Sequence, residues 1–123
     1  MTTISAYALP KEYLLRQAAQ FVAVFACNCN VGGENFVVAG KPNDLGHPRL
    51  GLVASRKLAP RAVDRNGFKR QAREVFRLNQ HVLGGIDVVV KLRRPFRPDE
   101  ATRARARAEL TRLMLKLEKC RAC

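Results

Sequence analysis

The sequence predicts an α+β fold in which a mixed sheet of about four strands packs with three helices in the order αβββαβα. Three observations support this prediction. The length of 123 residues suits one domain. Short β-prone runs are interrupted by stretches in which apolar residues recur at helical spacing. Clusters of Gly and Pro separate these segments. We therefore expect a single domain over residues 1–123, with its core at about residues 10–119.

The first half of the chain is predicted to hold one helix and three strands. Pro10 precedes apolar residues at helical spacing, which predicts a helix over residues 11–20. The apolar run 21–29 and the β-prone run 36–39 flank a Gly-Gly turn, and this pattern predicts a hairpin. After a loop rich in Pro, Asn, Asp and Gly, residues 49–55 supply a third strand.

The second half is predicted to hold two helices and one strand. A basic connection over residues 56–64 leads into a helix over residues 65–80, which a pair of glycines ends. The β-branched run 86–92 predicts the fourth strand. Asp99 is a suitable N-cap for a last helix that runs to about residue 119. The apolar face of that helix consists of Ala106, Leu110, Leu113, Met114 and Leu117.

The charge of the chain indicates a polyanionic partner. There are 23 Lys and Arg residues against 10 Asp and Glu residues, a net charge of +13. Residues 1–48 hold 3 basic and 3 acidic groups, residues 49–77 hold 9 and 2, and residues 78–123 hold 11 and 5. The basic excess thus begins inside the folded domain. Because most of these cations are arginines, which bind phosphates through two parallel hydrogen bonds, we expect a nucleic acid and not a membrane.

The N-terminus lacks the pattern of a signal peptide, and no apolar run reaches the roughly 20 residues of a membrane span. We therefore expect a cytoplasmic protein with reduced thiols. The cysteines leave one alternative open, a zinc site of four thiolates, although their spacing is not a common one for zinc. The residues concerned are Cys27, Cys29, Cys120 and Cys123.

The helix predicted over residues 65–80 has two faces. At about 100° per residue, five cations and one amide fall within an arc of about 140°, and the apolar residues fall almost entirely outside it. We call the following set the basic arc: Arg65, Asn66, Lys69, Arg70, Arg73 and Arg77. Like charges at this spacing weaken a helix by a few tenths of a kcal/mol per pair, which favours an anionic ligand. The alternative is that the basic arc is only a charged surface exposed to solvent and binds no anionic partner.

The same segment resembles a known family. The residues over 65–77 read Arg-Asn-Gly-Phe-Lys-Arg-Gln-Ala-Arg-Glu-Val-Phe-Arg. They are similar to the hallmark of the bacterial ribonuclease P protein family, in which an Arg-Asn-Arg start leads into a Lys-Arg-x-x-Arg-Glu-x-Phe-Arg helix. The resemblance covers about residues 10–98. It extends to Leu15, Phe21, Phe25, Arg49-x-Gly51, Ser55-Arg56-Lys57, Asp87-Val88-Val89-Val90 and Arg94-Pro95.

The resemblance implies a fold and a function. The implied fold is like that of ribosomal protein S5, with a left-handed β-α-β crossover that general rules would make right-handed. The implied function is that of the protein subunit of a ribonucleoprotein endoribonuclease. In that family a catalytic RNA subunit, which uses Mg²⁺, removes the 5′ leader of precursor tRNA, and the protein does not cut alone. The free protein is expected to be monomeric.

The resemblance also implies two sites. The basic arc would contact the catalytic RNA, and a cleft between the first helix and the sheet would bind the single-stranded leader. The expected cleft residues are Phe21, Phe25, Arg56 and Lys57. Without the resemblance, Phe21 and Phe25 would be placed in the core. Two positions depart from the family pattern: Gly67 replaces the second arginine of the Arg-Asn-Arg start, and Ala39 stands where some members carry an aromatic ring.

Two other functions remain possible on the sequence alone. A structural RNA-binding protein, such as a ribosomal one, would also carry this charge. An autonomous nuclease would need clustered carboxylates, whereas Asp44, Asp87 and Glu100 are scattered. We expect His47 and His81 to lie in surface loops and not in a catalytic site, because neither is part of a Ser or Cys nucleophile pattern.

Overall fold

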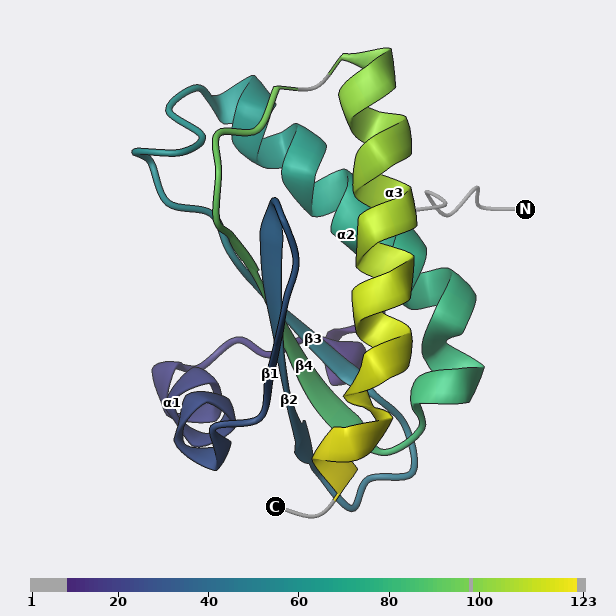
Figure 1. The fold of residues 1–123 in the computed structure, drawn as a ribbon. Helices are drawn as coiled ribbons and strands as arrows, with labels where there is room; N and C mark the ends of the chain where they lie inside the picture. Colours follow the sequence, from purple (N-terminus) through teal and green to yellow (C-terminus); the bar gives the residue numbers. More distant parts are fainter. Residues whose placement is uncertain (1–8, 98, 122–123) are drawn as a thin grey trace, which may run out of the picture.

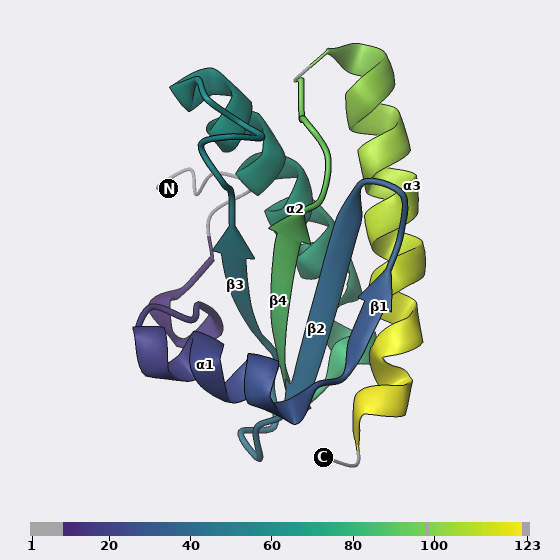
Figure 2. The same ribbon diagram turned by 60° about the vertical axis from the view of Figure 1, so that its left-hand side comes forward.

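A computed structural model describes residues 9–97 and 99–121 (Figure 1). A four-stranded sheet has α1 on one face and the longer helices α2 and α3 on the other (Figures 1 and 2). The elements are η1 (Lys11–Tyr13), α1 (Ala18–Cys27), β1 (Asn30–Gly32), β2 (Phe36–Pro42), β3 (Arg49–Val53), α2 (Ala62–Leu83), β4 (Ile86–Leu92), α3 (Glu100–Leu115) and η2 (Lys116–Arg121).

The sheet has the strand order β1-β2-β4-β3, in which only the β3–β4 pair is parallel. The mixed sheet and the order αβββαβα confirm the predicted fold class. In Figure 2, where α1 lies in front, the chain runs up β3, behind the sheet through α2, and up β4 to the right of β3. This is the left-handed crossover that the resemblance implies, and it departs from the usual right-handed rule.

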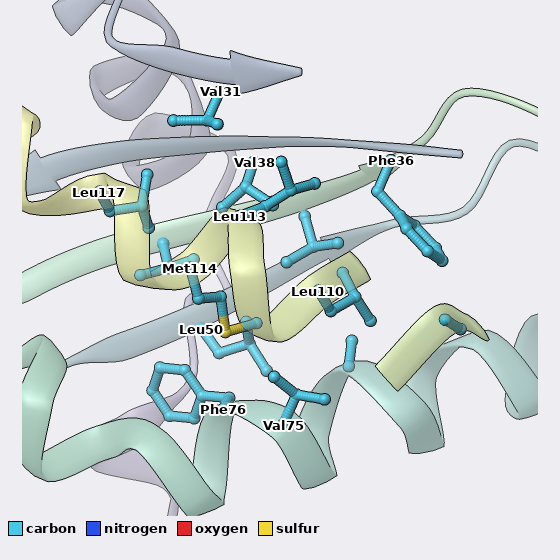
Figure 3. Packing of buried hydrophobic residues seen from close by; sticks show 14 of the residues in the cluster. Val31, Phe36, Val38, Leu50, Val75, Phe76, Leu110, Leu113, Met114 and Leu117 are labelled. Carbon is cyan, nitrogen blue, oxygen red and sulfur yellow. The ribbon is translucent and has the colours of Figure 1, made fainter. Parts of the chain in front are cut away.

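The larger core lies between the sheet and the two long helices. Figure 3 shows Val75 and Phe76 of α2 near Leu110 and Met114 of α3. The apolar face predicted for α3 is buried in full, because all five of its residues are at most 3% exposed. Asp99 caps α3 as predicted, since its carboxylate accepts a hydrogen bond of 2.8 Å from the backbone N–H of Thr102.

The prediction for residues 11–29 was wrong. Residues 11–13 form only the short η1. The main helix α1 spans Ala18–Cys27, so it shares only residues 18–20 with the predicted helix and occupies most of the run 21–29 that was predicted as a strand. The apolar run fits a helix because it needs to bury only one side against the sheet: Val24 is fully buried, whereas Val22 is 64% exposed. The first strand is consequently the short β1, which pairs with β2.

Helix α2 begins at Ala62, earlier than the sequence predicted, because an ion pair caps its first turn. The carboxylate of Asp64 accepts hydrogen bonds from the Nε and Nη2 atoms of Arg61, at 2.9 and 2.7 Å, and from the Arg61 backbone N–H at 3.3 Å. The hydrogen bonds from the Arg61 side chain hold the pKa of Asp64 below its ordinary value of 3.8. Asp64 thereby fixes the start of the helix that carries the basic arc.

The expectation of reduced thiols was also wrong, because Cys29 and Cys120 form a disulfide. Cys29 directly precedes β1, and η2 packs against the same end of the sheet, so residues 91 positions apart in sequence meet. A disulfide between them excludes the four-thiolate zinc site, which needs both thiolates. Cys123 lies outside the described residues.

The cap of α2 gives a testable dependence on pH. A lowered pKa means that the Asp64 carboxylate stabilises the fold above 3.8 and that this contribution is lost as the pH falls below 3.8. Asp64→Asn should therefore lower Tm near neutral pH, and the difference from the unaltered protein should shrink at about pH 3. Arg61→Ala removes the same ion pair and should give the same pattern. A difference that is constant over this range contradicts the prediction.

Candidate nucleic-acid interface

The basic arc lies along α2, next to the side of the helix that packs on the sheet. All six of its residues fall within Ala62–Leu83, and the side that packs on the sheet carries Phe68, Ala72, Val75 and Phe76, each at most 2% exposed. The structure therefore brings the predicted RNA-binding residues together on one helix. Asn66 and Arg70 are exposed, while the other four are partly buried along their stems.

Contacts within the protein hold both ends of the arc. The Nη1 atom of Arg65 donates hydrogen bonds of 3.0 Å to the backbone carbonyls of Ala59 and Pro60. At the other end, Arg77 and Glu74 form an ion pair at 2.7 Å. A guanidinium has five N–H donors, so each arginine retains donors for a phosphate after these contacts. The arginines at the two ends of the basic arc are therefore held in place by contacts within the protein.

The opposite face of the sheet carries α1 and a second candidate site. Leu15 and Val24 pack on Ala39 of β2 and Val89 of β4, which form one row across the sheet with Gly51 of β3. Ala39 is 2% exposed, so the second departure from the family pattern lies beneath α1. The next row consists of Val37, Lys91 and Val53 and is not fully covered. We call this second set the open row.

The two phenylalanines of α1 have different environments. Phe21 packs directly on Gly51: a Cβ atom at residue 51 would lie 2.6 Å from Cε2 of Phe21, so glycine is needed for this close approach. Phe25 is 39% exposed, and the Nζ atom of Lys91 lies 5.3 Å from the centre of its ring. Phe21 is thus largely a packing residue, and Phe25 is the one available at the surface.

Sequence reasoning missed Lys91. The signal was present, because side chains alternate along a strand and Lys91 must therefore share a face with Val89. The predicted residues Arg56 and Lys57 are exposed in the turn that follows β3. They lie beyond the strand end at Val53, so the open row separates them from α1 (Figure 2).

The carboxylates considered for a nuclease do not meet. Asp87 accepts hydrogen bonds from Arg49 at 2.8 Å and from Asn43 at 2.9 Å, and these bonds secure the loop before β3. Over residues 9–97 and 99–121 there is no group of three or more His, Cys, Asp or Glu side chains that could hold a metal ion. His47 packs against Tyr13, with 4.4 Å and 33° between the two rings. His81 is exposed, but it lies in the last turn of α2 and not in a loop as expected, because α2 continues to Leu83.

None of the helices in the described part of the chain is both long and apolar enough to cross a membrane.

The family model of ribonuclease P matches residues 9–118. Among curated proteins, the ribonuclease P protein component of Chromobacterium violaceum is 41% identical over 119 residues, which cover 97% of each chain. The protein component of Methylococcus capsulatus is 46% identical over 89 residues, which cover 72% of this chain and 70% of its relative.

Solved structures agree with these sequence matches. The fold is similar to that of the Staphylococcus aureus RNase P protein, with a TM-score of 0.75 and 30% identity over 88% of this chain and 96% of the other. It is also similar to the RNase P protein from Thermotoga maritima, with a TM-score of 0.68 and 30% identity over 83% and 94%. With the basic arc and the fold, these matches show that the chain belongs to the ribonuclease P protein component family, the accessory subunit that works with the ribonuclease P RNA in removing the 5′ leader from tRNA precursors.

Proposed function

We propose that this subunit binds two RNA segments at once: the catalytic RNA at the basic arc, and the single-stranded 5′ leader of precursor tRNA at the surface formed by α1 and the open row. One observation carries this proposal. The two surfaces lie on opposite faces of the sheet, with α2 on one and α1 on the other. Two strands of RNA can therefore approach without competing for the same cations.

The surface formed by α1 and the open row has the features that single-stranded RNA requires. Phe25 offers an exposed ring on which a base can stack, which contributes about 1 to 3 kcal/mol in comparable sites. Lys91 stands beside the ring and offers a cation to the adjoining phosphate. Arg56 and Lys57 extend the positive charge past the end of β3. Phe21 holds α1 on the sheet through its contact with Gly51.

The basic arc suits a folded RNA partner. Its arginines and lysine bind phosphates, which position the protein without reading sequence. In this proposal the protein supplies no catalytic residue, and the Mg²⁺ that the cleavage uses is held mainly by the RNA subunit. The protein is monomeric before assembly and acts in the cytoplasm, where precursor tRNA is processed.

Reconstitution tests whether the RNA subunit carries out the cleavage and the protein only assists it. Purified protein alone should leave precursor tRNA intact, and its addition to the cognate catalytic RNA should restore cleavage at a low Mg²⁺ concentration at which the RNA alone is slow. Cleavage by the protein without RNA would indicate an autonomous nuclease. Sedimentation of the protein with ribosomal subunits, in place of this RNA, would support a structural ribosomal role.

The salt dependence of RNA binding tests the basic arc. If about five leader or RNA phosphates are neutralised, the logarithm of RNA affinity should fall with the logarithm of salt concentration at a slope of roughly 3.5, taking the coefficient for single strands. Replacing Lys69, Arg70 and Arg73 with alanine should flatten this slope. The matched control removes three exposed cations from elsewhere: Arg112, Lys116 and Lys119. Equal slopes for both triple variants would mean that the arc is a solvated face.

The exposed ring of α1 can be tested with the assembled ribonucleoprotein. Phe25→Ala should weaken binding of leader-bearing precursor tRNA by about 1 to 3 kcal/mol, because a base loses its stacking partner. Binding of mature tRNA, which has no leader, should not change. Val22→Ala, at a position of α1 that is 64% exposed, is the control and should bind both forms normally. An equal loss for precursor and mature tRNA would place Phe25 outside the leader site.

A further inference from the structure

A groove between α2 and α3 lies beside the basic arc. Gly67, which has no side chain, lies on the flank of α2 that lines this groove. The space beside it is a groove of about 370 Å³, which Val63, Asn66, Gly67, Arg70 and Gln71 line from α2. The only lining residue that α3 supplies among the described positions is Arg103.

The lining of this groove has the chemistry of an anion site. Among the described residues that line it are two arginines and two amide side chains, and none of them is a carboxylate. The arginines come from different helices, so a ligand in the groove meets cations from both sides. A phosphate oxygen is the ligand that such guanidinium groups bind best.

We propose that Arg103 is a phosphate contact for the catalytic RNA and supplies, from α3, the cation that α2 lacks at Gly67. The RNA-binding surface then continues from the basic arc across the groove onto the first turns of α3. This inference rests on the proposed function, because it takes the basic arc to face the catalytic RNA.

Two other arginines of α3, Arg105 and Arg107, are placed differently. Arg105 lines a separate cavity on the other side of α3, together with Asn35 and Arg94. Arg107 is turned toward α2, but its Nη1 atom donates a hydrogen bond of 3.1 Å to the side chain of the buried Gln71. Arg103 and Arg105 lie near the same end of α3, and both interact electrostatically with Asp99. They therefore differ mainly in the side of α3 on which they lie.

This difference provides a matched pair for the test. Affinity of the full-length protein for the catalytic RNA is measured over a range of salt concentrations. Arg103→Ala should lower the affinity roughly tenfold and reduce the salt slope by about one, which is the effect of one lost phosphate contact. Arg105→Ala removes the same charge from the same end of α3 and should stay within about twofold of the unaltered protein. Arg103→Lys should retain part of the affinity, since it keeps the charge.

A rescue experiment separates a phosphate contact from a structural role. Gly67→Arg puts a guanidinium on the α2 side of the groove, where a helix accepts arginine better than glycine. In the Arg103→Ala background, Gly67→Arg should restore the affinity for the catalytic RNA to within about twofold of that of the unaltered protein. It should also return the salt slope to the value of the unaltered protein. Circular dichroism confirms that each variant is folded.

Two outcomes overturn the inference. One is equal affinity for the Arg103→Ala and Arg105→Ala variants, and the other is failure of Gly67→Arg to restore binding in the folded double variant. The Lys69, Arg70 and Arg73 triple variant distinguishes this failure from failure of the proposed function. If the triple variant loses RNA affinity but Arg103→Ala does not, only the role of Arg103 is wrong. If neither loses affinity, the arc itself does not face the RNA.

Discussion

The architecture depends on the burial of both faces of β4. Val88 and Val90 point into the core beneath α2 and α3, while Val89 points to the opposite face beneath α1. All three are fully buried. A strand that is apolar on both faces has to be covered from both sides, so the chain places helices on each face of the sheet. The parallel pairing of β3 with β4 adds a second constraint, because the connection between them must cross the sheet, and α2 is that connection.

This layered arrangement keeps the proposed RNA surfaces apart while one loop joins them. Arg65 of the basic arc donates to two carbonyls of the loop between β3 and α2. Lys57, in the same loop, lines a cavity with Arg61 and Asp64 at the start of α2. The loop is therefore fixed at its α2 end by hydrogen bonds and carries exposed cations near the end of β3. This loop thus links the start of α2 to the exposed cations Arg56 and Lys57, which follow β3.

The spacing of apolar residues along the sequence correctly predicted those helices and strands whose buried side chains follow that spacing. Residues 86–92 form a strand with the predicted bounds, and Asp99 caps α3 as predicted. Pattern failed at residues 21–29, where small and β-branched apolar residues suit a strand as well as a helix. The outcome there depended on the sheet, since α1 buries one side on Ala39 and Val89 and leaves Val22 in solvent. The early start of α2 was missed because its cap is an Asp64–Arg61 ion pair and not a Ser or Thr signal.

By itself, the sequence determined the fold class, the basic excess after residue 48, and the two faces of the helix that carries the basic arc. These properties follow from composition and from spacing within one element. Only the tertiary structure decided that Phe25 is more exposed than Phe21, that Lys91 lies beside it, and that Cys29 joins Cys120. The same holds for the position of Arg103 across the groove from Gly67. Each of these contacts links residues of different elements. Their distances depend on how the helices pack on the sheet, and the spacing of residues within one element gives no information about that packing.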